Sequence, residues 1–210
     1  MEEQKRNLKH SIIIFIAILA GIAAFFVKPA DPALASMRSA SPVLPAPVTF
    51  VKGAGPCGDK SKRYFDCGNG TVTDTLTGLI WLKKAYCLPE ANWEDAKKAV
   101  AALKNGDCML TDGSAPGDWR LPTNKEWEAT MAPAKSMMCS YPTLTNDDGT
   151  GCIKAGPSLF GTDLESSYFW SSVPVEGGSR VYMGDLDHGN VLNGESANSL
   201  PVWPVRDGNR

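Results

Sequence analysis

Short apolar and alternating segments, separated by turn residues, predict a chain built mainly from short strands. Residues 79–82 are apolar throughout, which predicts a central strand buried on both faces. The Asn-Gly pair at 69–70 separates 64–67 from 71–74 and favours a tight hairpin turn, because Asn-Gly tolerates positive φ. Further strands are expected at 168–172, 180–186, 190–192 and 201–206.

Helical periodicity occurs in two segments. The first follows Asn92, a suitable N-cap, and Gly106 is expected to end it. The second is expected at 124–131, with Pro133 ending it. No period holds over 134–164, which predicts a long loop region, and long loops in compact domains are often functional. Helices and antiparallel strands together predict an α+β fold.

The most specific motif joins the end of a strand to the start of a helix, and its residues are Trp119, Arg120, Leu121, Pro122, Thr123 and Glu126. Thr123 and Glu126 have the spacing of a capping box, in which each side chain bonds an amide of the first helical turn. Arg120 and Glu126 could instead line a binding site. We favour the structural role, with Arg120 in an ion pair or hydrogen bond at the strand end.

This motif resembles the DUF1566 domain of bacteria, also called the Lcl C-terminal domain after a collagen-like adhesin. Further segments resemble the family's opening hairpin, first helix and later strands, in the same order, and lie at 68–74, 77–81, 92–96, 168–172, 181–190 and 202–206. The resemblance implies a C-type-lectin-like fold, with two helices packed on small antiparallel sheets that carry long loops. The chain departs from the family by lacking the usual cysteine near its last strand.

The N-terminal segment, residues 1–35, has the pattern of an export signal. Positive charges precede an uncharged apolar run at 11–27, and small residues before Ser36 suit a signal peptidase. An uncleaved membrane anchor is the alternative, and both readings place the remaining chain in the periplasm, outside the cell or on its surface. Residues 36–51, rich in proline, alanine and serine, predict a tether. The folded domain is therefore expected at 52–210.

All cysteines lie beyond this signal, and their even number predicts disulfides in an oxidising compartment. Six cysteines allow many pairings, and the sequence does not choose among them. We expect sequential local pairs, namely Cys57–Cys67, Cys87–Cys108 and Cys139–Cys152. A zinc site is disfavoured, because there is no Cys-x-x-Cys pair and the exported part has a single histidine.

Charge and aromatic content limit the classes of partner that the sequence favours. The net charge is −2 and no basic stripe occurs, which argues against nucleic acid. The tryptophans number 6, and exposed indole faces would suit sugar rings. Core packing is the favoured interpretation, because large aromatic side chains dominate core energetics.

Catalysis is not expected. His188 lies in a predicted turn without a recognisable nucleophile nearby. The Arg120–Trp127 stretch also resembles formylglycine-generating enzymes, but such an enzyme needs late free cysteines and none follows Cys152. No cofactor is expected. Calcium is the alternative, with Asn146, Asp147 and Asp148 as weak candidate ligands, although such clusters are usually turns.

The sequence thus predicts a non-catalytic, exported module that recognises a polysaccharide or an envelope or surface protein, with membrane contact only through an uncleaved N-terminal segment. The expected contact residues lie in the loop at 140–165 and the segment at 173–190, and they are Tyr141, Asp147, Asp148, Arg180, Tyr182, Asp185 and His188. Two alternatives stay open: a structural or assembly subunit of an envelope complex, and an enzyme related to formylglycine-generating enzymes.

Overall fold

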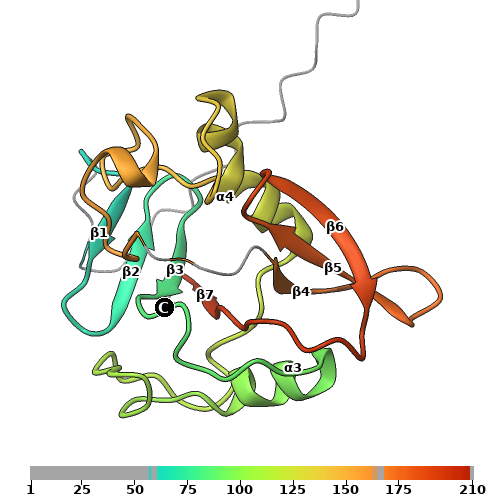
Figure 1. Ribbon diagram of the computed structural model, residues 1–210. Helices are drawn as coiled ribbons and strands as arrows, with labels where there is room; N and C mark the ends of the chain where they lie inside the picture. Colours follow the sequence, from blue (N-terminus) through green and yellow to red (C-terminus); the bar gives the residue numbers. More distant parts are fainter. Residues whose placement is uncertain (1–56, 58–60, 163, 165–167, 209–210) are drawn as a thin grey trace, which may run out of the picture. The chain divides into compact units, whose positions relative to one another are not determined.

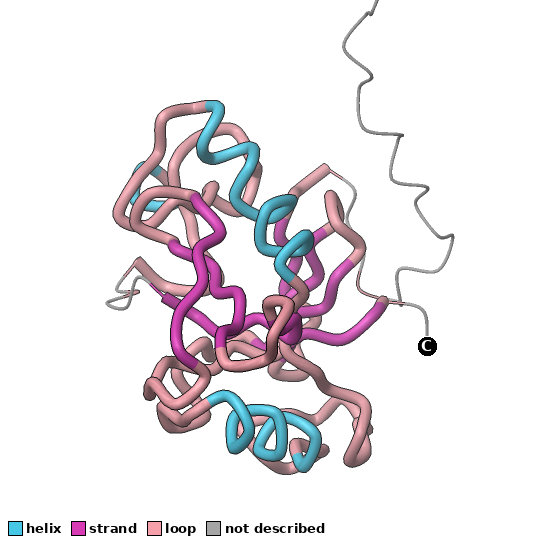
Figure 2. The backbone as a smooth tube through the Cα atoms, turned by 90° about the vertical axis from the view of Figure 1, so that its right-hand side faces the viewer, coloured by secondary structure: helices cyan, strands magenta, loops and turns pink. Residues whose placement is uncertain are grey.

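Two small antiparallel sheets and two α-helices make up the described part of the computed structural model, which covers Cys57, residues 61–162, Leu164 and residues 168–208. The helices lie on opposite sides of the strands, as Figure 1 and Figure 2 show from two directions. The predicted α+β fold is confirmed, and the C-type-lectin-like likeness stays a prediction. The export signal and tether predicted at 1–51 lie outside the described residues.

The first sheet has the strand order β1-β2-β3-β7, and its strands are β1 (Tyr64–Asp66), β2 (Thr71–Asp74), β3 (Leu79–Leu82) and β7 (Val205–Asp207). As predicted, β3 is buried along its length. The last strand, β7, pairs with it. The β1–β2 turn requires glycine at position 70, where φ is +86° and an added Cβ would stand 2.6 Å from the carbonyl oxygen of Met109.

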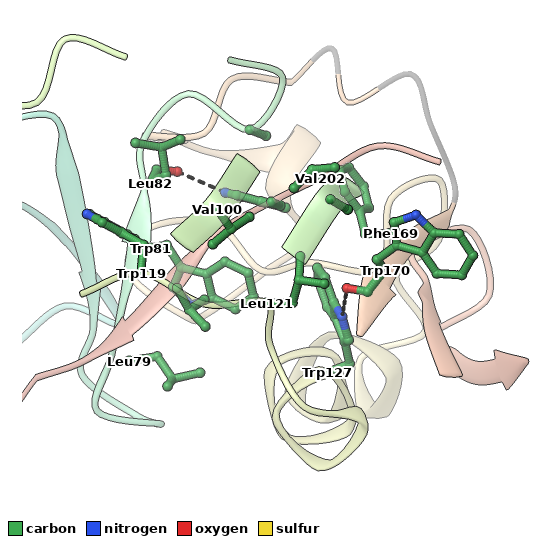
Figure 3. Packing of buried hydrophobic residues seen from close by; sticks show 14 of the residues in the cluster. Leu79, Trp81, Leu82, Val100, Trp119, Leu121, Trp127, Phe169, Trp170 and Val202 are labelled. Carbon is green, nitrogen blue, oxygen red and sulfur yellow. Dashed lines mark hydrogen bonds between the residues drawn. The ribbon is translucent and has the colours of Figure 1, made fainter. Parts of the chain in front are cut away.

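The second sheet has the order β4-β5-β6, and its strands are β4 (Tyr168–Pro174), β5 (Arg180–Asp185) and β6 (Asn190–Glu195). Helix α4 (Asn124–Ser136) packs against this sheet. The indole N–H of Trp127 donates to the carbonyl of Trp170 at 3.2 Å (Figure 3), which fixes the helix on β4.

The helices begin as predicted, but neither ends where expected: the first ends at Ala102, before Gly106, and the second continues past Pro133. Asn92 caps α3 (Trp93–Ala102) by accepting the Asp95 amide at 3.0 Å. The expectation that Pro133 ends α4 is wrong, because the helix continues to Ser136. Its last turn is closed by amides beyond the proline, including that of Cys139, which donates to the Ala134 carbonyl at 2.9 Å. A short 3-10 helix, η2 (Ile153–Ala155), follows in the long loop.

The tryptophans form the core that joins both sheets and both helices (Figure 3). All are buried, and they are Trp81, Trp93, Trp119, Trp127, Trp170 and Trp203. The rings of Trp81, Trp127 and Trp203 lie within contact, with centroid distances of 5.2, 4.9 and 6.2 Å. In this structure the indole faces are therefore used for packing, and sugar stacking on them is not available.

The three expected disulfides are all present: Cys57–Cys67, Cys87–Cys108 and Cys139–Cys152. They span 10, 21 and 13 residues. In the chain-entropy model a loop of this size stabilises the fold by about 3 kcal/mol. No cysteine is left free. Among the described residues, neither helix has the length and apolar character that crossing a bilayer requires.

Candidate functional site

The structure divides the expected contact residues among three places. Tyr141, Asp185 and His188 come together at the turn between β5 and β6. Asp147 and Asp148 lie beside residues 62–64, next to the first sheet. Arg180 and Tyr182 lie farther along β5.

A buried carboxylate organises the β5–β6 turn. The Asp185 side chain is 2% exposed, and its Oδ1 accepts the amides of Asp187 and His188 at 3.0 and 3.3 Å. Its Oδ2 lies 3.0 Å from Nδ1 of His188. The backbone and the imidazole are thus held by one carboxyl group.

His188 also bonds Tyr141 and thereby orients it. A carboxylate can only accept hydrogen bonds, so we assign the proton of the neutral imidazole to Nδ1 from the bonding pattern. Nε2 then accepts the hydroxyl of Tyr141 at 3.2 Å. The two rings meet edge to face, with a centroid distance of 5.4 Å. The chain Asp185–His188–Tyr141 therefore fixes the direction of an exposed phenol.

Hydrogen bonds hold residues 139–152, which we call the Tyr141 loop, and the preceding end of α4 on the same turn. The amide of Tyr141 donates to the Asp187 carbonyl at 3.3 Å, and the Lys135 ammonium donates to the Gly189 carbonyl at 3.1 Å. The Cys139–Cys152 disulfide closes this loop covalently. The loop is thus attached to the hairpin at several points.

Apolar groups stand exposed on this frame. Tyr141 is 56% exposed and Met138, three residues earlier, is 90% exposed. We call Met138, Tyr141 and His188 the Tyr141 surface. Met138 was not among the contact residues expected from the sequence. An apolar residue beside a loop cysteine, just after a helix, is the signal that would have indicated it.

The two neighbouring aspartates of the long loop differ in their contacts, and only Asp147 bonds other segments of the fold through short hydrogen bonds. The carbonyl of Asp147 accepts the amides of Arg63 and Tyr64, both at 2.9 Å. Its Oδ1 accepts the amide of Leu159 at 2.9 Å, and burial raises the pKa of its carboxyl group. Asp148 is exposed and lies 3.9 Å from the Lys62 ammonium.

The predicted calcium ligands are engaged in the same loop. Oδ1 of Asn146 accepts the amides of Thr150 and Gly151 at 3.0 and 3.3 Å. Within the described ranges, no group of three or more histidine, cysteine, aspartate or glutamate side chains is arranged to hold a metal ion. Calcium binding here stays the alternative to the expectation of no cofactor.

Arg180 and Tyr182 lie apart from the Tyr141 surface. Arg180 donates to the Asn193 carbonyl at 2.9 Å and lies 3.8 Å from the Glu195 carboxylate. It lies five positions before Asp185 on β5, which corresponds to roughly 16 Å along the strand. Tyr182 is half-buried opposite Asn193. The expected contact set is therefore not one contiguous site.

The capping-box motif has the contacts expected of a structural element. Arg120 binds Glu126 through two hydrogen bonds of 2.7 Å, and it also reaches Asp207 at 2.6 Å. The Thr123 hydroxyl and the Glu126 carboxylate complete the capping box. Burial alone would raise the pKa of Glu126, but the Arg120 guanidinium and the Thr123 amide outweigh it and hold that pKa below its usual value.

A family model for the Lcl C-terminal domain matches residues 70–206. The chain belongs to this family. A comparison with curated proteins finds no significant match. The matched part of this Lcl C-terminal domain runs from the β1–β2 turn to β7, and it contains the capping-box motif and the Tyr141 surface.

Proposed function

We propose that this protein is an exported, non-catalytic recognition module of the bacterial envelope that binds its partner through the Tyr141 surface. The partner is an extracellular polysaccharide or an envelope or surface protein. Family membership supports an envelope-associated role. The charged and apolar pattern of residues 1–35 supports export.

The observation that carries this proposal is the Asp185–His188–Tyr141 chain. Exposed side chains normally lose rotational freedom when a partner binds, and that loss weakens association. Tyr141 is already bonded to His188, which is bonded to a buried carboxylate. An aromatic group held this way offers contact area to a partner at a reduced entropy cost.

The exposure of the same residues favours recognition over catalysis. An Asp-His-hydroxyl order also occurs in enzymes that activate a nucleophile. Catalytic groups act best where water is excluded. Tyr141 is 56% exposed and the His188 side chain is 53% exposed. These groups stand open to solvent, which suits a contact surface.

Met138 favours a second candidate, a subunit that packs on another envelope protein. A freely exposed methionine is an adaptable apolar contact of the kind found at protein-binding surfaces. Native mass measurement of envelope extracts separates the two candidates. A free monomer of this chain supports the recognition module, and a stable complex supports the assembly subunit.

The test compares two matched methionine variants. Met138 and Met109 both adopt positive φ, both lie beside a disulfide cysteine, and both are exposed. Residues 36–210, purified with disulfides intact, are screened against immobilised bacterial polysaccharides and envelope protein fractions. We expect Met138→Ala and Tyr141→Ala to reduce binding about tenfold or more, because central contacts dominate interface energies. Met109→Ala should bind as the wild type does.

One outcome of this binding comparison would contradict the role of the Tyr141 surface. If Tyr141→Ala binds every partner found in the screen as tightly as the wild type, the Tyr141 surface is not the contact. Melting temperatures of all variants, measured alongside, show whether any loss reflects unfolding.

A further inference from the structure

The imidazole nitrogen of His188 that can gain a proton is the one that contacts Tyr141. Nδ1 lies 3.0 Å from Oδ2 of Asp185, whose side chain is 2% exposed. A carboxylate only accepts hydrogen bonds, so Nδ1 keeps its proton in the neutral and in the charged imidazole. A proton is therefore gained or lost at Nε2, which lies 3.2 Å from the Tyr141 hydroxyl.

The bonds that position the two rings do not involve Nε2. Oδ1 of Asp185 accepts the amides of Asp187 and His188, and the Tyr141 amide donates to the Asp187 carbonyl. Adding a proton at Nε2 leaves all of these bonds intact. Nε2 and the phenol oxygen thus stay within hydrogen-bond distance, whichever of the two donates.

The direction of the His188–Tyr141 hydrogen bond depends on this proton. In the neutral imidazole Nε2 accepts the phenol O–H, so the phenol oxygen can only accept from a partner. In the charged imidazole Nε2 donates to the phenol oxygen, and the O–H of Tyr141 is released toward solvent. The exposed hydroxyl then both donates and accepts.

Charged groups from each neighbouring element surround the imidazole. Asp185 on β5 and Asp187 in the turn are acidic. Lys135 on α4 is basic, and its ammonium donates to a carbonyl of the turn at 3.1 Å. Tyr141 is the titratable neighbour from the loop. Protonation of His188 cancels the excess negative charge of this set, which also favours partner groups that accept hydrogen bonds.

His188 is the only histidine among the residues that the structure describes. Imidazole is the one side chain whose charge ordinarily changes between pH 5 and 8. We propose that protonation of His188 strengthens binding at the Tyr141 surface in acid, because it frees the Tyr141 O–H to donate to an acceptor group of the partner. This inference rests on the proposed function, since it requires a partner bound at the Tyr141 surface.

Nitrogen NMR tests the reversal of the hydrogen bond without a partner. The purified protein, with disulfides intact, is labelled with ¹⁵N at its histidines, and His188→Gln identifies the His188 signals. We expect Nδ1 to have the shift of a protonated nitrogen at about pH 8 and at about pH 5, with only Nε2 gaining a proton between them. An unprotonated Nδ1 at the higher pH would overturn the proposal.

The binding test repeats the screen against immobilised polysaccharides and envelope protein fractions at about pH 7.5 and about pH 5.5. We expect the wild type to bind about tenfold more tightly at the lower pH, the effect of one additional hydrogen bond. Because pH also changes the partners, the wild type is compared with His188→Gln, which should lack this difference. Tyr141→Phe keeps the ring and should lose most of it. Tyr182→Phe, a half-buried tyrosine farther along β5, is the matched control.

Two results of the binding test would overturn the proposal: the same pH dependence in the wild type and His188→Gln, or in the wild type and Tyr141→Phe. Either result leaves the proposed function standing if Tyr141→Ala still loses affinity. If Tyr141→Ala binds as the wild type does at both pH values, the proposed function is rejected and this regulation with it. If His188→Gln does not fold, Tyr141→Phe and the nitrogen shifts decide.

Discussion

Gly184 on β5 lies directly against the indole of Trp127 on α4, so that an added Cβ would stand 2.5 Å from the ring atom Cδ2. The sheet and the helix can approach this closely only because position 184 has no side chain. The same indole donates to the Trp170 carbonyl, so a displaced ring would also lose a buried hydrogen bond.

Replacing this glycine tests the contact. We expect Gly184→Ala to lower the free energy of unfolding by about 1 to 3 kcal/mol, the usual cost of overpacking a core. Urea denaturation followed by tryptophan fluorescence measures it. Gly194→Ala on β6 is the control, because its nearest neighbour is the mobile end of Met183 at 3.3 Å. Equal losses in both variants would contradict the role given to the Trp127 contact.

The Arg120–Glu126 pair predicts a particular pH dependence. The folded state holds the pKa of Glu126 below its unfolded value, so the pair stabilises the fold above the unfolded pKa. That contribution is lost as pH falls through the folded pKa. Glu126→Gln keeps a side chain that suits the capping box and removes the charge. We expect the stability difference between wild type and variant to shrink from about pH 5 to about pH 3.

Denaturation curves at a series of pH values check this. Other carboxylates titrate in the same range, and taking the difference between the two proteins removes their effect. A difference that stays constant with pH would mean that the ion pair adds no stability.

Neighbouring aspartates in the long loop should behave differently. Asp147→Ala removes the acceptor of the Leu159 amide, and we expect a loss of about 1 to 3 kcal/mol. Asp148→Ala removes only an exposed contact with Lys62, and we expect a loss below about 1 kcal/mol. Thermal unfolding of both variants measures the effects. If Asp148→Ala were the more destabilising, the assignment of Asp147 as the structural residue would be wrong.

Removing each of two disulfides in turn should lower stability by similar amounts, but only one of the two removals should weaken binding. Replacing Cys139 and Cys152 by serine should lower stability by about 2 to 4 kcal/mol and also weaken binding, because this bond closes the Tyr141 loop. Replacing Cys87 and Cys108 should lower stability similarly and leave binding unchanged under conditions where both proteins are folded. Circular dichroism and the partner-binding measurement together give the result. Equal affinity of the two variants for the partner would argue against a role of the Tyr141 loop in binding.

Local chemistry made much of the fold predictable. The Asn92 cap, the Asn-Gly turn and the Thr123–Glu126 spacing each specify structure through contacts a few residues apart. The end of α4 was predicted wrongly, because bonds made after Pro133 keep the last turn closed. Such bonds depend on how the chain folds back after the helix. The residue type at a single position does not predict this.

The candidate site was harder to predict because it joins distant positions. Tyr141 and His188 are separated by 47 residues and meet only through the pairing of loop and hairpin.

The Cys57–Cys67 bond determines how the domain responds to mechanical load. A pull on the chain ahead of Cys57 passes through the two sulfur atoms to the β1–β2 turn and bypasses β1. Peeling that strand from its neighbour, the easiest way to open a sheet from its edge, is thereby blocked while the bond is oxidised. A domain held at its N-terminal side would thus resist traction, and chemical reduction would remove that resistance.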